Sequence, residues 1–406
     1  MRRVKKGIKT LLHTARQLKL VKPFEVVKRK NITIVPFEEL LDRPVGLSDH
    51  KGGPIWGSWS DTNNLRHRRF AFEDDCPAIP ASIDRIEHTP LLWCGAIVSH
   101  FGHQVADFTS RIVAYKIYEK DHNGESLYYC FAVKPDSGIS RFEDTPAFFK
   151  QIIEWYEIKP EQIYIVDKPI KSRKLLVTPQ LEVLALNGSP IPIHDQYIAY
   201  LGAQAEKNLG KEEKNNHIYY ISRSKITGGE LAGESYLDEF FQANGVTVIY
   251  PEKLSLVEQI KLYRNAKALV FLEGSALHGL QFLGETSTSI YIINRRSGYR
   301  VMEDGFKKRF PHVGYYDITT LIHGLTPAGG QAKWDGISIL EREGLQQLVE
   351  TLGLNFNLWQ DDVFKQRERA QLTKWVERKK ACPDTGYPKS IELIGQKLNE
   401  AGYDLI

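Results

Sequence analysis

Apolar residues along the chain alternate between short strand-like runs and longer segments with helical spacing. In the first half, runs at 91–98, 126–133, 162–166 and 174–177 predict strands, and segments 100–116 and 146–157 predict helices. Strands separated by helical segments of this length are typical of parallel β-α-β units.

The second half repeats this plan. Runs at 217–221, 246–250, 268–272 and 289–293 predict strands, and segment 234–244 predicts a helix. Ser255 and Glu258 form a capping-box pattern that opens another helix. Gly274 predicts a turn into a helix that starts near Ser275, and the charged pattern from about residue 340 predicts a helical tail.

We therefore predict an α/β fold with two Rossmann-like domains facing a cleft and a helical C-terminal tail. The predicted units are a basic segment (1–30), an N-terminal domain (31–190), a C-terminal domain (191–335) and the tail (336–406), with the break between the domains at about 186–215.

The N-terminal segment is strongly basic, with Glu25 as its single acidic residue before residue 31. Its apolar residues recur at helical spacing, so it can form an amphipathic helix on an anionic membrane surface, or remain a solvated basic tail. No nucleic-acid recognition motif accompanies the charge. No apolar run is long enough for a membrane span or a signal peptide. We therefore expect a cytoplasmic protein, either free or peripheral at the inner face of the plasma membrane.

Several kinds of site are missing from the pattern. Cys76, Cys94, Cys130 and Cys382 lie far apart, which favours reduced thiols over a disulfide framework or a zinc cluster. No G-x-G-x-x-G fingerprint and no D-x-D triplet after an apolar strand is present. We therefore predict no cofactor and no metal.

Two polar loops follow predicted strands of the second half, at the edge of a parallel sheet where ligands bind. The first contains Ser222, Arg223 and Lys225, and the second begins Glu273-Gly274-Ser275. A helix start favours a phosphate, and an arginine can grip a diphosphate with two hydrogen bonds. These residues thus suit a nucleoside diphosphate leaving group, although Ser275 could merely cap its helix and Arg223 merely form a surface ion pair.

A second constellation lies in segment 100–111. At helical spacing, one polar stripe contains His100, His103, Asp107 and Arg111. A histidine on such a stripe can act as a general base, with His103 oriented by Asp107. The same residues could instead be a solvated helix face, and a metal site is a weaker reading.

Several motifs, taken in order and spacing, resemble glycosyltransferase family 61, in its bacterial, capsular polysaccharide branch. They are Tyr220-Ile-Ser-Arg-Ser-Lys225, Glu234, Tyr250-Pro-Glu252, segment 254–259 and Glu273-Gly-Ser-Ala-Leu-His278. Segment 100–111 fits the family's upstream motif of histidine, acidic residue and arginine. The resemblance covers about residues 90–300.

The resemblance implies a GT-B fold and an inverting, metal-independent transfer from a nucleotide sugar to a glycan or lipid-linked glycan, in capsule, lipopolysaccharide or exopolysaccharide synthesis. It implies that Arg223 holds the diphosphate, that Glu273, Gly274, Ser275 and His278 form the donor loop, and that His103 or Asp107 is the base. The other predicted substrate-binding residues are Ser222, Lys225, Glu252, His100 and Arg111. The position of His278 relative to the glycine differs from the eukaryotic pattern, so its role stays open.

Two other functions use the same residues. A non-catalytic carbohydrate-binding protein would be favoured if Arg223, His103 and Asp107 did not converge. A hydrolase could use Ser275, His278 and Asp107, but Ser275 and His278 lie three residues apart and not on a G-x-S-x-G elbow.

Overall fold

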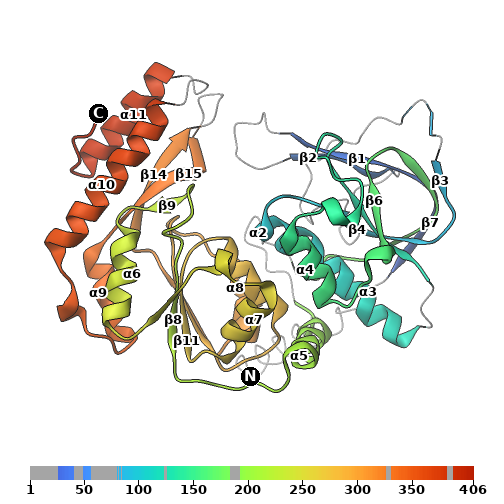
Figure 1. The fold of residues 1–406 in the computed structure, drawn as a ribbon, viewed down its shortest axis with the longest axis horizontal. Helices are drawn as coiled ribbons and strands as arrows, with labels where there is room; N and C mark the ends of the chain where they lie inside the picture. Colours follow the sequence, from blue (N-terminus) through green and yellow to red (C-terminus); the bar gives the residue numbers. More distant parts are fainter. Residues whose placement is uncertain are drawn as a thin grey trace, which may run out of the picture.

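The computed structural model describes residues 26–40, 49–55, 80, 82–83, 85–122, 126–182, 193–325, 331–381 and 387–406. Their strands form three sheets, and helices connect most of the successive parallel strands (Figure 1). The protein has a mixed α/β fold, as the alternating sequence pattern predicts. Among the described residues, no helix is long and apolar enough to cross a membrane.

The N-terminal region, residues 26–182, contains a mixed sheet in the order β2-β1-β7-β4-β5-β6, with β3 paired to β7. Strands β4, β5 and β6 are parallel, and β7 runs parallel to β4 but antiparallel to β1. The strands are β1 (Val27–Leu40), β2 (Asp49–Ile55), β3 (Arg85–Glu87), β4 (Leu91–Ala96), β5 (Tyr128–Ala132), β6 (Ile163–Val166) and β7 (Ile170–Val177). The helices are α2 (Phe101–His103), α3 (Ser110–Asp121) and α4 (Ala147–Trp155).

Strand β1 changes the interpretation of the basic segment, which was predicted to extend through residue 30. Residues 27–30 pair with β7 instead of continuing a helix. Lys28 and Lys30 are exposed and alternate with the half-buried Val27 and Arg29, which is the two-residue period of a strand. Residues 1–25, on which the amphipathic-helix prediction rests, lie outside the described residues, as do Cys76, Cys382 and residues 186–192 of the predicted interdomain break. Cys94 and Cys130 are buried free thiols.

The C-terminal region, residues 218–406, contains a five-stranded parallel sheet in the order β10-β8-β11-β12-β13. Its strands are β8 (Ile218–Ile221), β10 (Thr247–Ile249), β11 (Ala268–Leu272), β12 (Ser289–Ile293) and β13 (His312–Tyr316). Its helices are α6 (Glu234–Ala243), α7 (Leu256–Asn265) and α8 (Glu303–Arg309). The predicted capping box of α7 is confirmed, because Ser255 Oγ accepts a hydrogen bond from the backbone N–H of Glu258. The helix predicted from Ser275 is a 3₁₀ helix, Ser275–Phe282, and not an α-helix.

A smaller sheet and three helices complete this region. The sheet has the order β14-β15-β9, with β9 (Glu230–Leu231), β14 (Thr319–Leu325) and β15 (Gln331–Leu340). The helices are α9 (Arg342–Thr351), α10 (Asp361–Lys380) and α11 (Tyr387–Glu400). The helical tail is therefore present, but the predicted boundary at residue 336 falls inside β15.

The two regions lie side by side with α5 (Asp195–Leu209) between them (Figure 1), and one hydrophobic cluster contains buried residues of both. Gly202 of α5 lies against the backbone of Gly284, where a side chain at position 284 would collide. Arg309 of α8 donates to Glu182 of the N-terminal region at 2.7–2.8 Å, and both side chains are completely buried. The desolvation cost of a buried ion pair is offset only when its charged groups stay hydrogen-bonded to each other. This contact therefore fixes how the two regions pack together.

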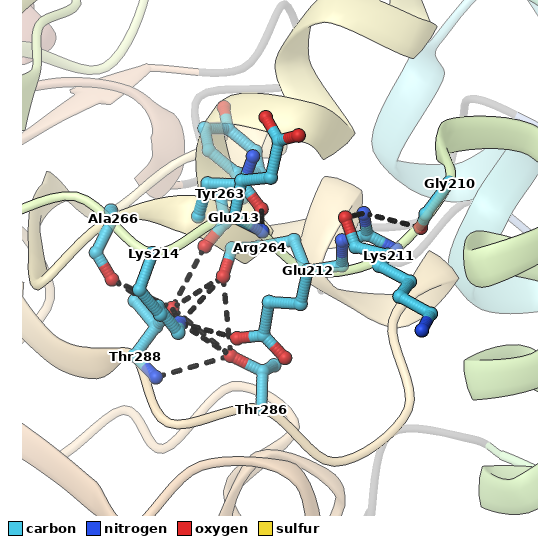
Figure 2. Close-up of polar contacts among 11 residues, drawn as sticks. Gly210, Lys211, Glu212, Glu213, Lys214, Tyr263, Arg264, Ala266, Thr286 and Thr288 are labelled. Carbon is cyan, nitrogen blue, oxygen red and sulfur yellow. Dashed lines mark hydrogen bonds and ion pairs between the residues drawn. The ribbon is translucent and has the colours of Figure 1, made fainter.

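At the amino-terminal edge of the parallel sheet, Lys214 fastens the segment between α5 and β8 (Figure 2). Its ammonium group donates to the carbonyl oxygen of Arg264 at 2.6 Å and to Thr288 Oγ1 at 2.7 Å. Thr286 Oγ1 and a Glu212 carboxylate oxygen lie at 3.1 and 2.7 Å from the same nitrogen. An ammonium has three protons to donate, so the surrounding oxygens meet its needs fully.

Candidate active site

The opposite, carboxyl-terminal edge of the parallel sheet gathers the predicted donor loops. Arg223 follows β8, the segment Glu273-Gly274-Ser275 follows β11, and Arg295 and Arg296 follow β12. These strands are neighbours in the order β8-β11-β12, so the three loops lie at one edge. The segment Ser275–Phe282 packs against α2, which brings this edge to the N-terminal region.

Arg223 is held at both its backbone and its side chain. Its backbone N–H donates to Glu234 Oε1 at 2.6 Å, and its Nη2 donates to the carbonyl oxygen of Gly228 at 3.1 Å. The guanidinium lies directly over Gly274, where any Cβ would collide with it. Gly274 has an extended backbone that any residue adopts, so a glycine is needed there for space. The Nε atom of Arg223 is buried without a hydrogen-bond partner among the described residues.

Glu273 contacts the loop after β12. Its carboxylate accepts from the backbone N–H groups of Arg295 and Arg296 at 3.0 and 3.1 Å and pairs with the Arg296 guanidinium. Glu273 is almost completely buried. Its carboxylate is therefore occupied by protein groups. Sequence reasoning missed Arg295 and Arg296, although they follow a predicted strand in the same way as Arg223 does.

His100 joins the two regions. Its Nδ1 accepts from the backbone N–H of His103 at 3.2 Å, and its Nε2 lies 3.2 Å from Ser275 Oγ. Because a backbone N–H can only donate, the neutral ring has its proton on Nε2 and donates to Ser275. Desolvation and the nearby His103, His278 and Arg223 lower the pKa of His100 to about 4, so the ring is neutral at pH 7. The Ser275 hydroxyl proton therefore points away from His100.

His103 and Asp107 form the predicted pair, with 3.0 Å between Nδ1 and Oδ2. The His103 side chain is 46% exposed, whereas that of Asp107 is 7% exposed. This bond places the proton of neutral His103 on Nδ1 and leaves Nε2 as an acceptor. Residues Gln104–Thr109 form a π-helical segment, a feature common at functional sites. The Gln104 amide fixes its start by bonding Val98 N and Ala96 O.

His278 completes the junction. It is buried, its Nδ1 lies 2.7 Å from Gln281 Oε1, and a Cβ on Gly102 would press against the rings of both His278 and His100. Burial lowers the pKa of His278. The histidine whose role the sequence left open thus packs beside the predicted base region, and its Nδ1 is taken by Gln281.

Comparison of the sequence with known protein families indicates what class of protein has this arrangement. Residues 101–291, a little under half of the chain, match the family model described as Glycosyltransferase 61. The match assigns this segment to glycosyltransferase family 61. The protein is therefore a glycosyltransferase, and the matched segment contains His103, Asp107, Arg223 and Ser275. No curated protein matches the chain.

Two of the predicted substrate-binding residues of this glycosyltransferase, Arg111 and Ser222, are buried. Arg111 is completely buried and donates to the carbonyl oxygen of Thr178 at 2.7 Å. The predicted stripe is therefore exposed only at its His100 and His103 end, because the helix turns inward along the sheet. Ser222 is also completely buried, and its hydroxyl lies 3.4 Å from Glu234 Oε1. Both side chains are enclosed by protein, so their predicted role in substrate binding does not fit their burial.

Lys225 and Glu252 lie towards β10. The Lys225 ammonium sits over the Tyr250 ring, 5.8 Å from its centroid. Glu252 is exposed on the 3₁₀ turn Pro251–Lys253. Both remain at the carboxyl-terminal edge of the sheet, on the β10 side of Arg223.

The hydrolase reading does not fit the observed contacts. Ser275 bonds His100 and not His278, while the Nδ1 of His100 takes a backbone N–H. Asp107 bonds His103 instead. A nucleophile, a base and an orienting carboxylate are therefore not in series here. Within the described ranges, no group of His, Cys, Asp or Glu is arranged to hold a metal ion.

Proposed function

We propose that this glycosyltransferase moves a sugar from a nucleotide-sugar donor to a glycan or lipid-linked glycan acceptor, inverting the anomeric carbon without a metal ion. The proposal includes a GT-B-like arrangement, with the donor on the C-terminal Rossmann-like domain and the acceptor entering from the N-terminal one. The observation that carries it is the hydrogen bond between His100 and Ser275, which joins the predicted base region to the predicted phosphate region.

A continuous series of contacts supports this arrangement. Arg223 lies on Gly274, the next residue Ser275 bonds His100, and His100 accepts from the backbone of His103. A cationic group for the leaving diphosphate and a paired histidine for the acceptor thus lie along one short path. Inverting transfer needs both groups on opposite sides of one anomeric carbon.

In the proposed reaction, the acceptor hydroxyl gives its proton to Nε2 of His103 while its oxygen bonds the anomeric carbon. The bond from that carbon to the phosphate oxygen breaks, and the electron pair leaves with the nucleoside diphosphate. Asp107 stabilises the imidazolium that forms, and Arg223 stabilises the charge growing on the leaving group. His103 is the better base of the two candidates, because Asp107 is buried and already bonded to it.

The cellular role is proposed from the sequence. Bacterial cell-surface polysaccharide synthesis at the inner face of the plasma membrane would place the basic residues 1–30 next to anionic lipid. Sedimentation with vesicles containing anionic lipid should carry the full chain down, and a chain lacking residues 1–25 should stay in solution. Equal sedimentation of the two chains would remove the membrane proposal and leave the transferase proposal intact.

The transferase proposal is tested by thermal-shift titration against UDP-, GDP-, dTDP- and CMP-sugars, followed by transfer assays with the donor that binds. A donor at 100 times its dissociation constant adds about 2.7 kcal/mol to the free energy of unfolding, which is a shift of a few degrees. Binding without transfer or donor hydrolysis would favour a non-catalytic carbohydrate-binding protein. A flat response to every donor at high concentration would overturn the proposal.

A further inference from the structure

The loop after β12 contains two adjacent arginines in different surroundings. Arg296 pairs with Glu273, and its guanidinium carbon lies 3.9 Å from the centroid of the Tyr299 ring. Arg295 is only 6% exposed, and its Nε donates to the carbonyl oxygen of Glu273 at 2.7 Å. The Nη1 atom of Arg295 is buried and has no hydrogen-bond partner in the part of the chain that the structure describes.

Arg295 and Arg223 contact the same glycine turn from two strands. Arg223 donates to the carbonyl oxygen of Gly228, and Arg295 lies so close to Gly229 that a Cβ there would collide with its guanidinium. Gly228 and Gly229 have φ values of +90° and +60°, which disfavour side chains. The turn thus brings two guanidinium groups together beside Gly274.

This pair of cations has too little negative charge around it. Burial, followed by the charge of Arg223, lowers the pKa of Arg295 to about 10, so Arg295 is still charged at pH 7. The carboxylate of Glu273 is taken by Arg296 and by two backbone N–H groups. A buried cation with an unsatisfied donor is costly unless an anion completes it.

We propose that Arg295 is a second donor-binding residue, which contacts one phosphate of the donor while Arg223 contacts the other. The inference rests on the proposed function. In this role Glu273 is a positioning residue, which holds the backbone and Nε of Arg295 and leaves Nη1, beside Gly229, for the phosphate. Arg295 lies just beyond the segment that matches the family model, at the end of a strand that the sequence predicts.

The experiment is calorimetric titration of the full chain with inorganic pyrophosphate and with the nucleotide sugar that the thermal-shift panel selects. The variants are Arg295→Gln and Arg295→Lys. Arg264→Gln is the matched control, because Arg264 is also 6% exposed and also has one buried N–H group, at Nε, without a partner among the described residues, but it lies at the opposite edge of the sheet, where it donates to the carbonyl oxygens of Gly210 and Lys211 (Figure 2).

We expect Arg295→Gln to bind both probes about 10- to 100-fold more weakly, the usual effect of losing a charge-assisted hydrogen bond. Arg295→Lys should lie between it and the wild type, because the charge remains without the planar fork. The thermal midpoint of ligand-free Arg295→Gln should be unchanged or higher, since a buried unpaired cation is removed. Arg264→Gln should bind as the wild type does.

Wild-type affinity in folded Arg295→Gln would overturn the inference, and so would an equal loss of affinity in Arg264→Gln. Failure of the proposed function looks different. If pyrophosphate binds and depends on Arg295 while no nucleotide sugar binds, the anion site stands and the transferase mechanism falls.

Discussion

The two edges of the five-stranded parallel sheet treat cationic side chains in opposite ways. At the amino-terminal edge, the Lys214 ammonium is surrounded by carbonyl, hydroxyl and carboxylate oxygens (Figure 2). At the carboxyl-terminal edge, Arg223 and Arg295 are gathered around Gly274 and a glycine turn, each with a buried N–H group that no described residue satisfies. Arg264 at the amino-terminal edge also has a buried Nε without a partner among the described residues. What distinguishes the carboxyl-terminal edge is therefore that two such arginines meet at one glycine turn.

The difference separates a structural cation from a functional one. A fully bonded cation contributes to folding, since removing it leaves several buried oxygens unpaired. A cation with spare donors in a buried place costs folding free energy, and that cost is recovered when an anion binds. We therefore expect substitutions at the two edges to divide cleanly between stability and activity.

The largest effect is expected where the N-terminal region faces the carboxyl-terminal edge. His103→Ala should lower kcat by about 10²- to 10⁴-fold, because a general base contributes this much. Donor affinity should stay within a few-fold, since His103 acts on the acceptor. Steady-state transfer kinetics with a calorimetric Kd check both, and near-normal kcat in the folded variant would move the base elsewhere.

Arg223→Ala should come next. Loss of a preorganised group that stabilises leaving-group charge lowers kcat/KM by about 10²- to 10³-fold. The thermal midpoint should change little, because the backbone bond from Arg223 to Glu234 does not need the side chain. If the variant keeps its activity, the carboxyl-terminal edge is not the donor site.

Lys214→Met should reverse this pattern. It leaves carbonyl and hydroxyl oxygens without their donor, so the free energy of unfolding should fall by about 1–3 kcal/mol. Activity per folded molecule should match the wild type. Denaturant unfolding and transfer assays on the same sample measure the two quantities. An activity loss exceeding the loss of folded protein would break the contrast between the edges.

The smallest effect is a pH dependence through Glu234. Burial raises the pKa of Glu234 to about 7, against the lowering influence of Arg223. Its other close neighbours are Tyr220, Asp238 and, by charge, Arg295. The folded state therefore favours the neutral carboxyl, and this group lowers stability as pH rises from about 4.5 through 7.

Ionised Glu234 also offsets the positive charge that attracts a phosphate. Nucleotide-sugar affinity should fall by up to about tenfold between pH 6 and 8, the equivalent of one pKa unit. Glu234→Gln should flatten this dependence. The diphosphate of a nucleotide sugar does not titrate in this range, so calorimetric titrations at each pH isolate the protein group. The same slope in Glu234→Gln would exclude this carboxyl as its source.

Local patterns in the sequence predict the parallel sheets and the α7 capping box, because periodicity and capping depend on neighbouring residues. They miss β1, β14 and β15, which rest on pairing between distant segments or on a hairpin outside the predicted sheets. The segment after Gly274 is a 3₁₀ helix that packs against α2, and a helical pattern distinguishes neither its geometry nor its partner.

Part of the candidate site could be predicted from the rule that ligands bind at the carboxyl-terminal ends of parallel strands. That rule locates Arg223 and Gly274, and applied to β12 it would also have located Arg295. Which of the other predicted residues can reach a ligand depends on their burial, which the sequence does not reveal. Arg111 and Ser222 share the spacing of ligand-binding residues, yet the fold turns both inward. The spare donor of Arg295 depends on Gly229 and Glu273, which lie far from it along the chain.

The most direct test of the contrast between the edges is a crystal structure of the protein with the nucleoside diphosphate of its donor. We predict the diphosphate at the carboxyl-terminal edge, beside Gly274, with phosphate oxygens within hydrogen-bond distance of both Arg223 and Arg295, and Lys214 unchanged. A diphosphate bound elsewhere, with the buried N–H groups of both arginines still unpaired, would contradict the account.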